Sequence, residues 1–130
     1  MNVLLLVSGG LATFMVLGHS TLGRKQFFLP MLEASFDPTA KRIMAFVWHM
    51  STATLVAAAA ALIYAGLIQG DGAAVGVAGR PLTLYIGLQF LAYGAVHLFL
   101  VSTSKLPGAV YKQFQWSLFF AVGLTAWAGA

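Results

Sequence analysis

The chain alternates long apolar stretches with short polar connections, and this pattern predicts four helices of membrane-spanning type. The longest uncharged stretch runs from Ile43 to Ile68. At about 1.5 Å per residue it forms roughly 39 Å of helix, enough to cross a hydrocarbon core of about 30 Å with some tilt. The same pattern along the whole chain predicts helices over residues 3–22, 38–68, 81–102 and 111–128.

Short polar segments indicate where the predicted helices end. The first helix is expected to end at Gly23, and Phe27–Leu32, which contains Pro30, is expected to be an amphiphilic loop against the lipid headgroups. Asp37–Pro38 has the form of a helix N-cap followed by proline, so the second helix should begin there. A glycine-rich stretch and a Pro-Gly turn separate the remaining helices.

The amino-acid composition indicates a membrane protein and argues against nucleic acid as a binding partner. Hydrophobic residues make up 60% of the chain and charged residues only 8%, whereas soluble domains carry about 25% charged residues. We therefore expect one transmembrane domain over residues 1–130. The first apolar stretch lacks a basic leader and a cleavage site, so it is expected to be a retained helix. The seven lysines and arginines lie between apolar segments, which argues against nucleic acid as a partner.

The distribution of these cations predicts the orientation. Arg80 alone lies in the connection between the second and third helices. The connections after the first and third helices, with the turns that flank them, hold Arg24, Lys25, Lys41, Arg42, Lys105 and Lys112. Because cytoplasmic loops are enriched in Lys and Arg, both termini are expected on the non-cytoplasmic side. The predicted fold is an all-α, up-down-up-down four-helix bundle in the bacterial inner membrane.

Three histidines stand at similar distances from these cations. His19 lies before Arg24, His49 after Arg42, and His97 before Lys105, which places each imidazole roughly 7–12 Å inside the cytoplasmic boundary. One interpretation is a cofactor site, with a Cu or Zn ion held by all three or a haem b held by two. Alternatively, each histidine hydrogen-bonds a neighbouring helix, or the three form a proton path.

The third predicted helix carries a polar stripe, in which Tyr85, Gln89, Tyr93 and His97 recur every four residues. This spacing places them along one slowly winding face. Gln89 and Tyr93 are therefore candidates to line a haem or quinone pocket with His97, or to conduct protons. The competing interpretation is that these groups hold the second and third helices together.

Two ladders of small residues recur at the same spacing and predict close helix crossings. They are Ala53, Ala57, Ala61 and Ala65 in the second helix, and Ser117, Ala121, Thr125 and Gly129 in the fourth. Small side chains let helix backbones approach closely within a membrane. The crossings can lie within one chain or between two copies.

Two short motifs resemble a loosely defined group of small bacterial membrane proteins of unassigned function. In that group a His-Ser-x-x-Gly-Glu sequence ends the first helix and a Trp-His pair lies in the second. The matching positions here are His19, Ser20, Gly23, Trp48 and His49. Arg24 replaces the glutamate of the group. The resemblance covers the first half of the chain and implies that His19 and His49 act as a pair.

Together these features predict a small inner-membrane protein that acts as a non-catalytic subunit or homo-oligomer, with a histidine-lined metal or haem site near the cytoplasmic side. One alternative is a purely structural accessory subunit of a larger membrane complex. Another is a small transporter or proton-path component that uses the polar stripe. The sequence contains no phosphate-binding loop, H-E-x-x-H motif, nucleophile elbow or paired carboxylate. The absence of cysteine excludes disulfides and thiolate metal sites.

Overall fold

The computed structural model describes residues 1–68 and 79–130, and this part of the chain is mostly helical, without strands. The helices are α1 (Val3–Gly18), the π-helix η1 (His19–Phe28), α2 (Leu29–Glu33), α3 (Pro38–Ile68), α4 (Gly79–Thr103), α5 (Ala109–Lys112) and α6 (Gln115–Gly129). Since α1, η1 and α2 follow one another without a break, they form one continuous helix.

Three helices in the described residues are long and apolar enough to cross a membrane. They are Val3–Glu33, Pro38–Ile68 and Gly79–Thr103, with 31, 31 and 25 residues. The expected all-α class and membrane character are thereby confirmed. The last helix, α6, has 15 residues, about 22 Å, and is shorter than a hydrocarbon core of about 30 Å.

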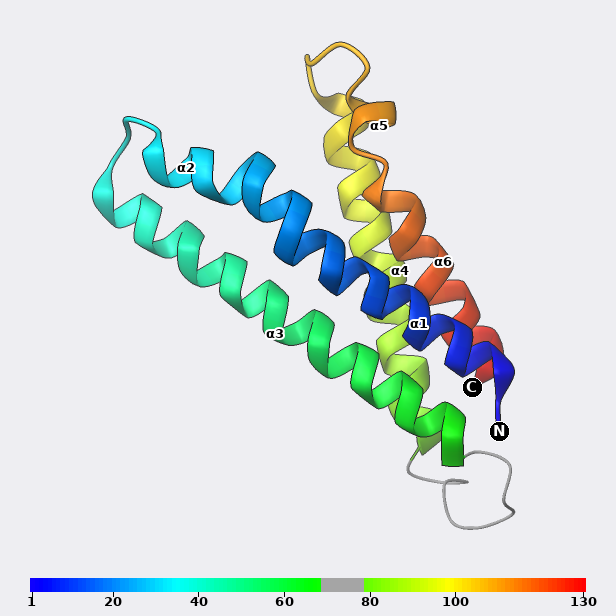
Figure 1. Ribbon diagram of the computed structural model, residues 1–130. Helices are drawn as coiled ribbons and strands as arrows, with labels where there is room; N and C mark the ends of the chain where they lie inside the picture. Colours follow the sequence, from blue (N-terminus) through cyan, green and yellow to red (C-terminus); the bar gives the residue numbers. More distant parts are fainter. Residues whose placement is uncertain (69–78) are drawn as a thin grey trace.

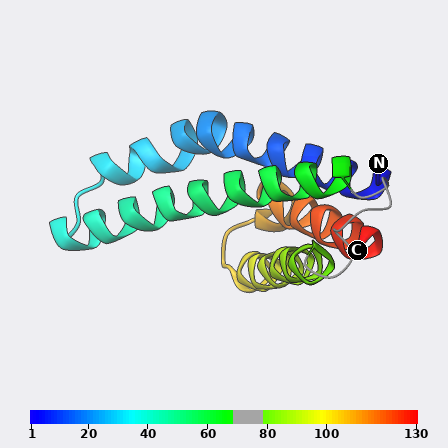
Figure 2. The ribbon, with the colours of Figure 1, turned by 90° about the horizontal axis from the view of Figure 1, so that it is seen from below.

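The helices are arranged as two antiparallel pairs (Figures 1 and 2). The continuous helix α1–η1–α2 packs along α3, and α4 packs along α6. Contact between α1 and α6 joins the two pairs, while α3 and α4 touch much less. The two pairs lie together at the end that holds both chain termini and diverge toward the other end (Figure 1).

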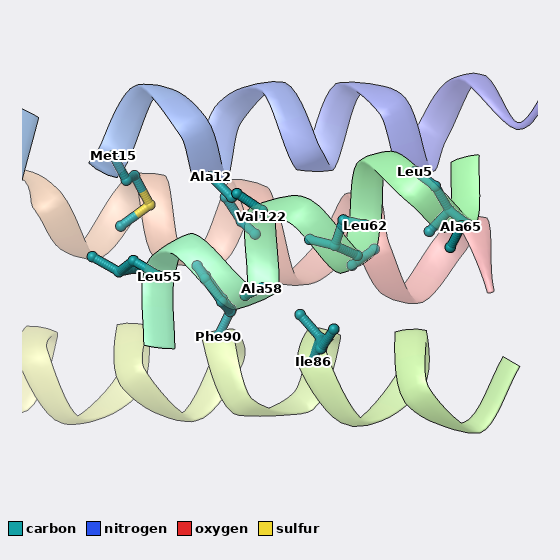
Figure 3. Packing of buried hydrophobic residues seen from close by; sticks show 12 residues of the cluster. Leu5, Ala12, Met15, Leu55, Ala58, Leu62, Ala65, Ile86, Phe90 and Val122 are labelled. Atoms are coloured by element: carbon teal, nitrogen blue, oxygen red, sulfur yellow. The ribbon is translucent and has the colours of Figure 1, made fainter. Parts of the chain in front are cut away.

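An apolar core fills the region where the pairs meet (Figure 3). Leu5, Leu62, Phe90 and Val122 are fully buried in it. Met15 and Leu55 mark its limit toward the diverging end, and no residue of η1 is buried. The core therefore holds the termini-bearing half of the molecule together, and the other half depends on contacts within each pair.

Glycines allow the closest crossings within both pairs. A Cβ at Gly9 would lie 2.6 Å from Ile63 Cγ1 and 2.9 Å from its backbone nitrogen, and a Cβ at Gly66 would lie 2.9 Å from the Leu6 nitrogen. In the other pair, a Cβ at Gly123 would lie 2.9 Å from the Gly87 carbonyl oxygen. These helices therefore approach at distances that only glycine permits.

The predicted ladder of small residues in α3 coincides only in part with the face of α3 that packs against other helices. In α3 the ladder residue Ala65 is buried, but Ala53 and Ala57 are exposed. The buried face of α3 is formed instead by Leu55, Ala58, Ala59, Leu62, Ala65 and Gly66. A strict spacing of four winds slowly around a helix of 3.6 residues per turn, so the ladder leaves the contact face within this chain. A crossing between two copies through Ala53 and Ala57 stays a prediction.

Hydrogen bonds tie three helices together near the termini. The Asn2 backbone N–H donates to the Gly66 carbonyl (2.7 Å), and the Asn2 side-chain amide donates to the Gly129 carbonyl (2.8 Å). The Asn2 Oδ1 atom accepts from the Leu5 N–H and so caps α1. One turn further along, the buried Ser8 hydroxyl donates to the Val122 carbonyl (2.9 Å). Both termini are thereby fixed at one end of the molecule.

The predicted end of the first helix at Gly23 is wrong, and Phe27–Leu32 is helical instead of a loop. Pro30 has no N–H to donate within the helix. The preceding turns use wider π-type bonding, in which the Leu29 N–H donates to the Arg24 carbonyl. Such local adjustment lets apolar helices continue through proline.

The predicted fourth helix, 111–128, is divided in the structure. It consists of the single turn α5 and the longer α6, separated at Gln113 and Phe114. Gly108 precedes α5 with φ of 70°, a left-handed conformation that glycine adopts without strain. The expected Pro-Gly turn therefore lies where the sequence indicates it.

Candidate functional site

The π-helix η1 brings two distant side chains to one face. His19 and Phe28 are the first and last residues of η1, nine positions apart. Nine residues make about two and a half turns of an α-helix, which would place the two side chains on opposite faces. A π-helix has roughly 4.4 residues per turn, so nine residues make about two turns and return to the same face. Both side chains consequently face α3.

On α3 both rings stack against Trp48. The ring centroids of His19 and Trp48 are 3.8 Å apart with an interplanar angle of 19°, and those of Phe28 and Trp48 are 5.1 Å apart with an angle of 21°. His49 meets Phe28 edge-on at 5.6 Å. We call His19, Phe28, Trp48 and His49 the Trp48 stack. Such ring contacts are each worth about 0.5–1.5 kcal/mol beyond the area they bury.

Gly23 makes room for the indole. A Cβ at this position would lie 3.1 Å from Trp48 Cη2, closer than most real contacts of that kind, whereas a Cβ at Gly18 would meet nothing within 4 Å. The motif residues His19, Gly23, Trp48 and His49 thus belong to one contact region. Ser20 is exposed and lies outside the stack.

The two histidines of the stack differ in their environment. The Nε2 atom of His19 is buried and has no hydrogen-bond partner in the described part of the chain. His49 is exposed to the surroundings of the protein. Buried ring nitrogens normally have a partner, so the His19 imidazole is the more unusual of the two.

His97 lies on the other helix pair, with Gln89 and Tyr93. The His97 ring is 6.2 Å from the Phe119 ring of α6, and the Tyr93 ring is 5.8 Å from the same phenyl group. Gln89 donates through Nε2 to the Tyr93 hydroxyl at 2.6 Å. The Nε2 atom of His97 is buried without a hydrogen-bond partner among the described residues. Within the described residues, the bond between Gln89 and Tyr93 is the one side-chain hydrogen bond of the predicted stripe.

The structure does not support the predicted three-histidine cluster. Within residues 1–68 and 79–130, which include all three histidines, no group of three or more His, Asp or Glu side chains is placed to hold a metal ion. His19 and His49 lie in one helix pair and His97 in the other, and the pairs diverge at this end. Similar distances from the flanking cations place the three histidines at a similar depth in the membrane. They do not specify how far apart the helices lie in the membrane plane, so they do not imply that the imidazoles are close.

A metal ion therefore has no group of three or more donor side chains in the described residues. Zinc and copper sites generally use three or four ligands, whereas only His19 and His49 of the three histidines belong to one contact region, through Trp48 and Phe28. Ring contacts hold both of these imidazoles instead. We derive no chemical step through a bound metal or haem.

Two aromatic residues of the site were missed in the sequence. The sequence predicts Phe28 in a loop and gives no signal that singles out Phe119. A π-helix has no simple residue signature, so the return of Phe28 to the His19 face could not be inferred from α-helical spacing. Pro30, two residues after Phe28, is the one sequence signal of irregular helical bonding in this segment.

Comparisons with protein-family models, with curated proteins and with solved structures found no significant match to this chain.

Proposed function

We propose that this protein is a small, non-catalytic subunit of the bacterial inner membrane, with four membrane-crossing helices and both termini on the non-cytoplasmic side. The observation that carries the topology is the bond between Asn2 and Gly129, which fixes both termini at one end. Three membrane-length helices alone would leave the termini on opposite sides. The segment that contains α5 and α6 must then complete the fourth crossing, although α6 itself is short.

The charges support the same orientation. The two ends of the α1–η1–α2 and α3 pair differ in charge. Its cations lie in η1 and in the first turns of α3, at residues 24, 25, 41 and 42. Figure 1 shows that these segments lie at the end away from the termini. In the other pair, Lys105 precedes α5 and Lys112 is its last residue, at the corresponding end. Under the rule that Lys and Arg remain inside, this end faces the cytoplasm.

The proposed subunit role rests on the contacts that the candidate site residues make. His19, Tyr93 and His97 each pack against an aromatic ring of another helix, and Gln89 bonds to its own neighbour Tyr93. The ring contacts of His19, Tyr93 and His97 join helices, as expected of a structural role. A purely structural accessory role in a larger membrane complex would use the same contacts.

A reporter fusion tests the topology. Alkaline phosphatase, which is active only outside the cytoplasm, is fused after Ala130, and green fluorescent protein, which fluoresces mainly inside, is fused at the same place in a parallel strain. We expect phosphatase activity and no fluorescence. Fluorescence with an inactive phosphatase would contradict the proposed non-cytoplasmic placement of the C-terminus.

A second candidate function, ligand binding at the Trp48 stack, is favoured by the buried and unpartnered Nε2 of His19. The test is an optical spectrum and elemental analysis of protein purified from native membranes, compared with His19→Leu and with His97→Leu. A bound group lost in His19→Leu alone would support this function. A colourless, metal-free protein would leave the scaffold role as the function.

A further inference from the structure

The outer face of α4 carries an unusual seam. Tyr85, Gln89, Ala92, Val96 and Phe99 follow one another at alternating spacings of four and three residues, so they align along one side of the helix. This side lies opposite the residues of α4 that are buried against the rest of the chain, namely Thr83, Ile86, Gly87, Phe90, Gly94 and Val101. Tyr85, Val96 and Phe99 are 59–65% exposed. Ala92 is exposed as well, and Gln89 is half-buried, so most of the seam is left uncovered by the described part of this chain.

A polar amide lies near the middle of this seam. Gln89 is two residues from the midpoint of α4, Gly79–Thr103, and thus near the centre of the bilayer in the proposed topology. Its Nε2 donates to the Tyr93 hydroxyl. A primary amide has a second N–H and an oxygen acceptor, and neither has a partner within the described residues. Polar groups left unpaired in hydrocarbon are strongly disfavoured.

We propose that this seam is the interface with a second copy of the same chain, paired about a two-fold axis through Gln89. An amide carries both a donor and an acceptor, so two copies of Gln89 satisfy each other across such an axis. Ala92, one turn along the seam, lets the two α4 backbones approach. Alternating spacings of four and three suit a left-handed crossing of two helices, and one polar residue within such a seam fixes its register.

This proposed interface rests on the proposed function, because it requires α4 to cross the membrane. It adds a partner to that function, namely a second copy of the chain. A lipid-exposed seam and a seam covered by a different protein are the competing outcomes. Lipid acyl chains offer Gln89 no hydrogen-bond partner, and a different protein would need a matching polar group at the same depth. A second copy supplies that group by symmetry.

Cysteine crosslinking in native membranes tests the proposal, since the chain has no cysteine of its own. Ala92→Cys places a thiol in the seam, and Ala57→Cys, also at an exposed alanine of a membrane-length helix, is the matched control. On oxidation with copper phenanthroline we expect an Ala92→Cys adduct of twice 13.8 kDa and at least fivefold less adduct with Ala57→Cys. Equal adduct from both, or none from Ala92→Cys, would overturn the proposal.

The role of the amide is tested in the Ala92→Cys background. Gln89→Leu should weaken association about tenfold, equivalent to about 1.4 kcal/mol, whereas Gln26→Leu in η1 should leave it unchanged. Unaltered crosslinking in Gln89→Leu would refute pairing through the amide. The phosphatase fusion is measured in the same strains, so failure of the topology registers there, while failure of the interface alone registers only in the crosslinking.

Discussion

At the scale of single residues, close packing depends on where a side chain is missing. Gly9 and Gly10 are neighbours in α1 with opposite surroundings. A Cβ at Gly9 would collide with Ile63, including its backbone, whereas a Cβ at Gly10 would meet nothing within 4 Å. Backbone cannot move aside as the end of a flexible side chain can, so the two positions should respond differently to the same substitution.

We therefore expect Gly9→Ala to lower the free energy of unfolding by about 1–3 kcal/mol, because α1 and α3 must separate to admit the methyl group. Gly10→Ala should leave stability unchanged or raise it by about 0.5–1 kcal/mol, since alanine favours the helix more than glycine does. Thermal unfolding of the two variants in the same detergent measures the difference. Equal melting temperatures would contradict the close crossing.

At the scale of secondary structure, the decisive element is the π-helix η1. Its wider turns allow the continuous helix to pass Pro30 and also aim both ends of η1 at Trp48. An α-helix over the same residues would present Phe28 on the side away from His19. The π geometry and the Trp48 stack therefore depend on each other.

The fluorescence of Trp48 tests this dependence. In a Trp116→Phe, Trp127→Phe background, Phe28→Ala should increase quenching of Trp48 by a soluble quencher, because it uncovers part of the indole. Phe27→Ala, at a neighbouring residue that is 46% exposed, should change quenching little. If both variants quench alike, η1 does not have the geometry described.

The sequence was sufficient for the features that depend on composition and periodicity. The span Pro38–Ile68 has the predicted bounds, since an N-cap motif and a long uncharged stretch define it locally. The lateral placement of His97 and the contact face of α3 depend on how helices cross, which α-helical spacing alone does not specify. The π-helix does not follow from the sequence, because Pro30 in a short apolar segment predicts a loop as readily as a helix with altered bonding.

At the scale of the whole molecule, one end is fixed and the other diverges. Asn2 links the start of α1 to the ends of α3 and α6, and the apolar core lies on the same side. The diverging end is held by the Trp48 stack in one pair and by the contacts of Phe119 in the other. The two pairs should therefore move relative to each other about the fixed end.

Two substitutions at Asn2 separate the contributions of this residue. Asn2→Asp keeps the oxygen that caps α1 but loses the donor to Gly129, and Asn2→Ala loses both. We expect faster amide hydrogen exchange in the last turn of α6 for both variants, with an additional loss of about 0.5–2 kcal/mol of stability for Asn2→Ala alone. Unchanged exchange near Gly129 in both variants would contradict the link.

The bond between Asn2 and Gly129 also sets an order of events during synthesis. The α1–α3 hairpin can form as soon as residue 68 has entered the bilayer, whereas the Asn2 amide must wait until almost the whole described chain has been translated. During that interval the face of α1 that later receives α6, with the Ser8 hydroxyl in it, is open to lipid or to an insertion factor. Closure of the bundle is thus expected to be a late, post-insertion step.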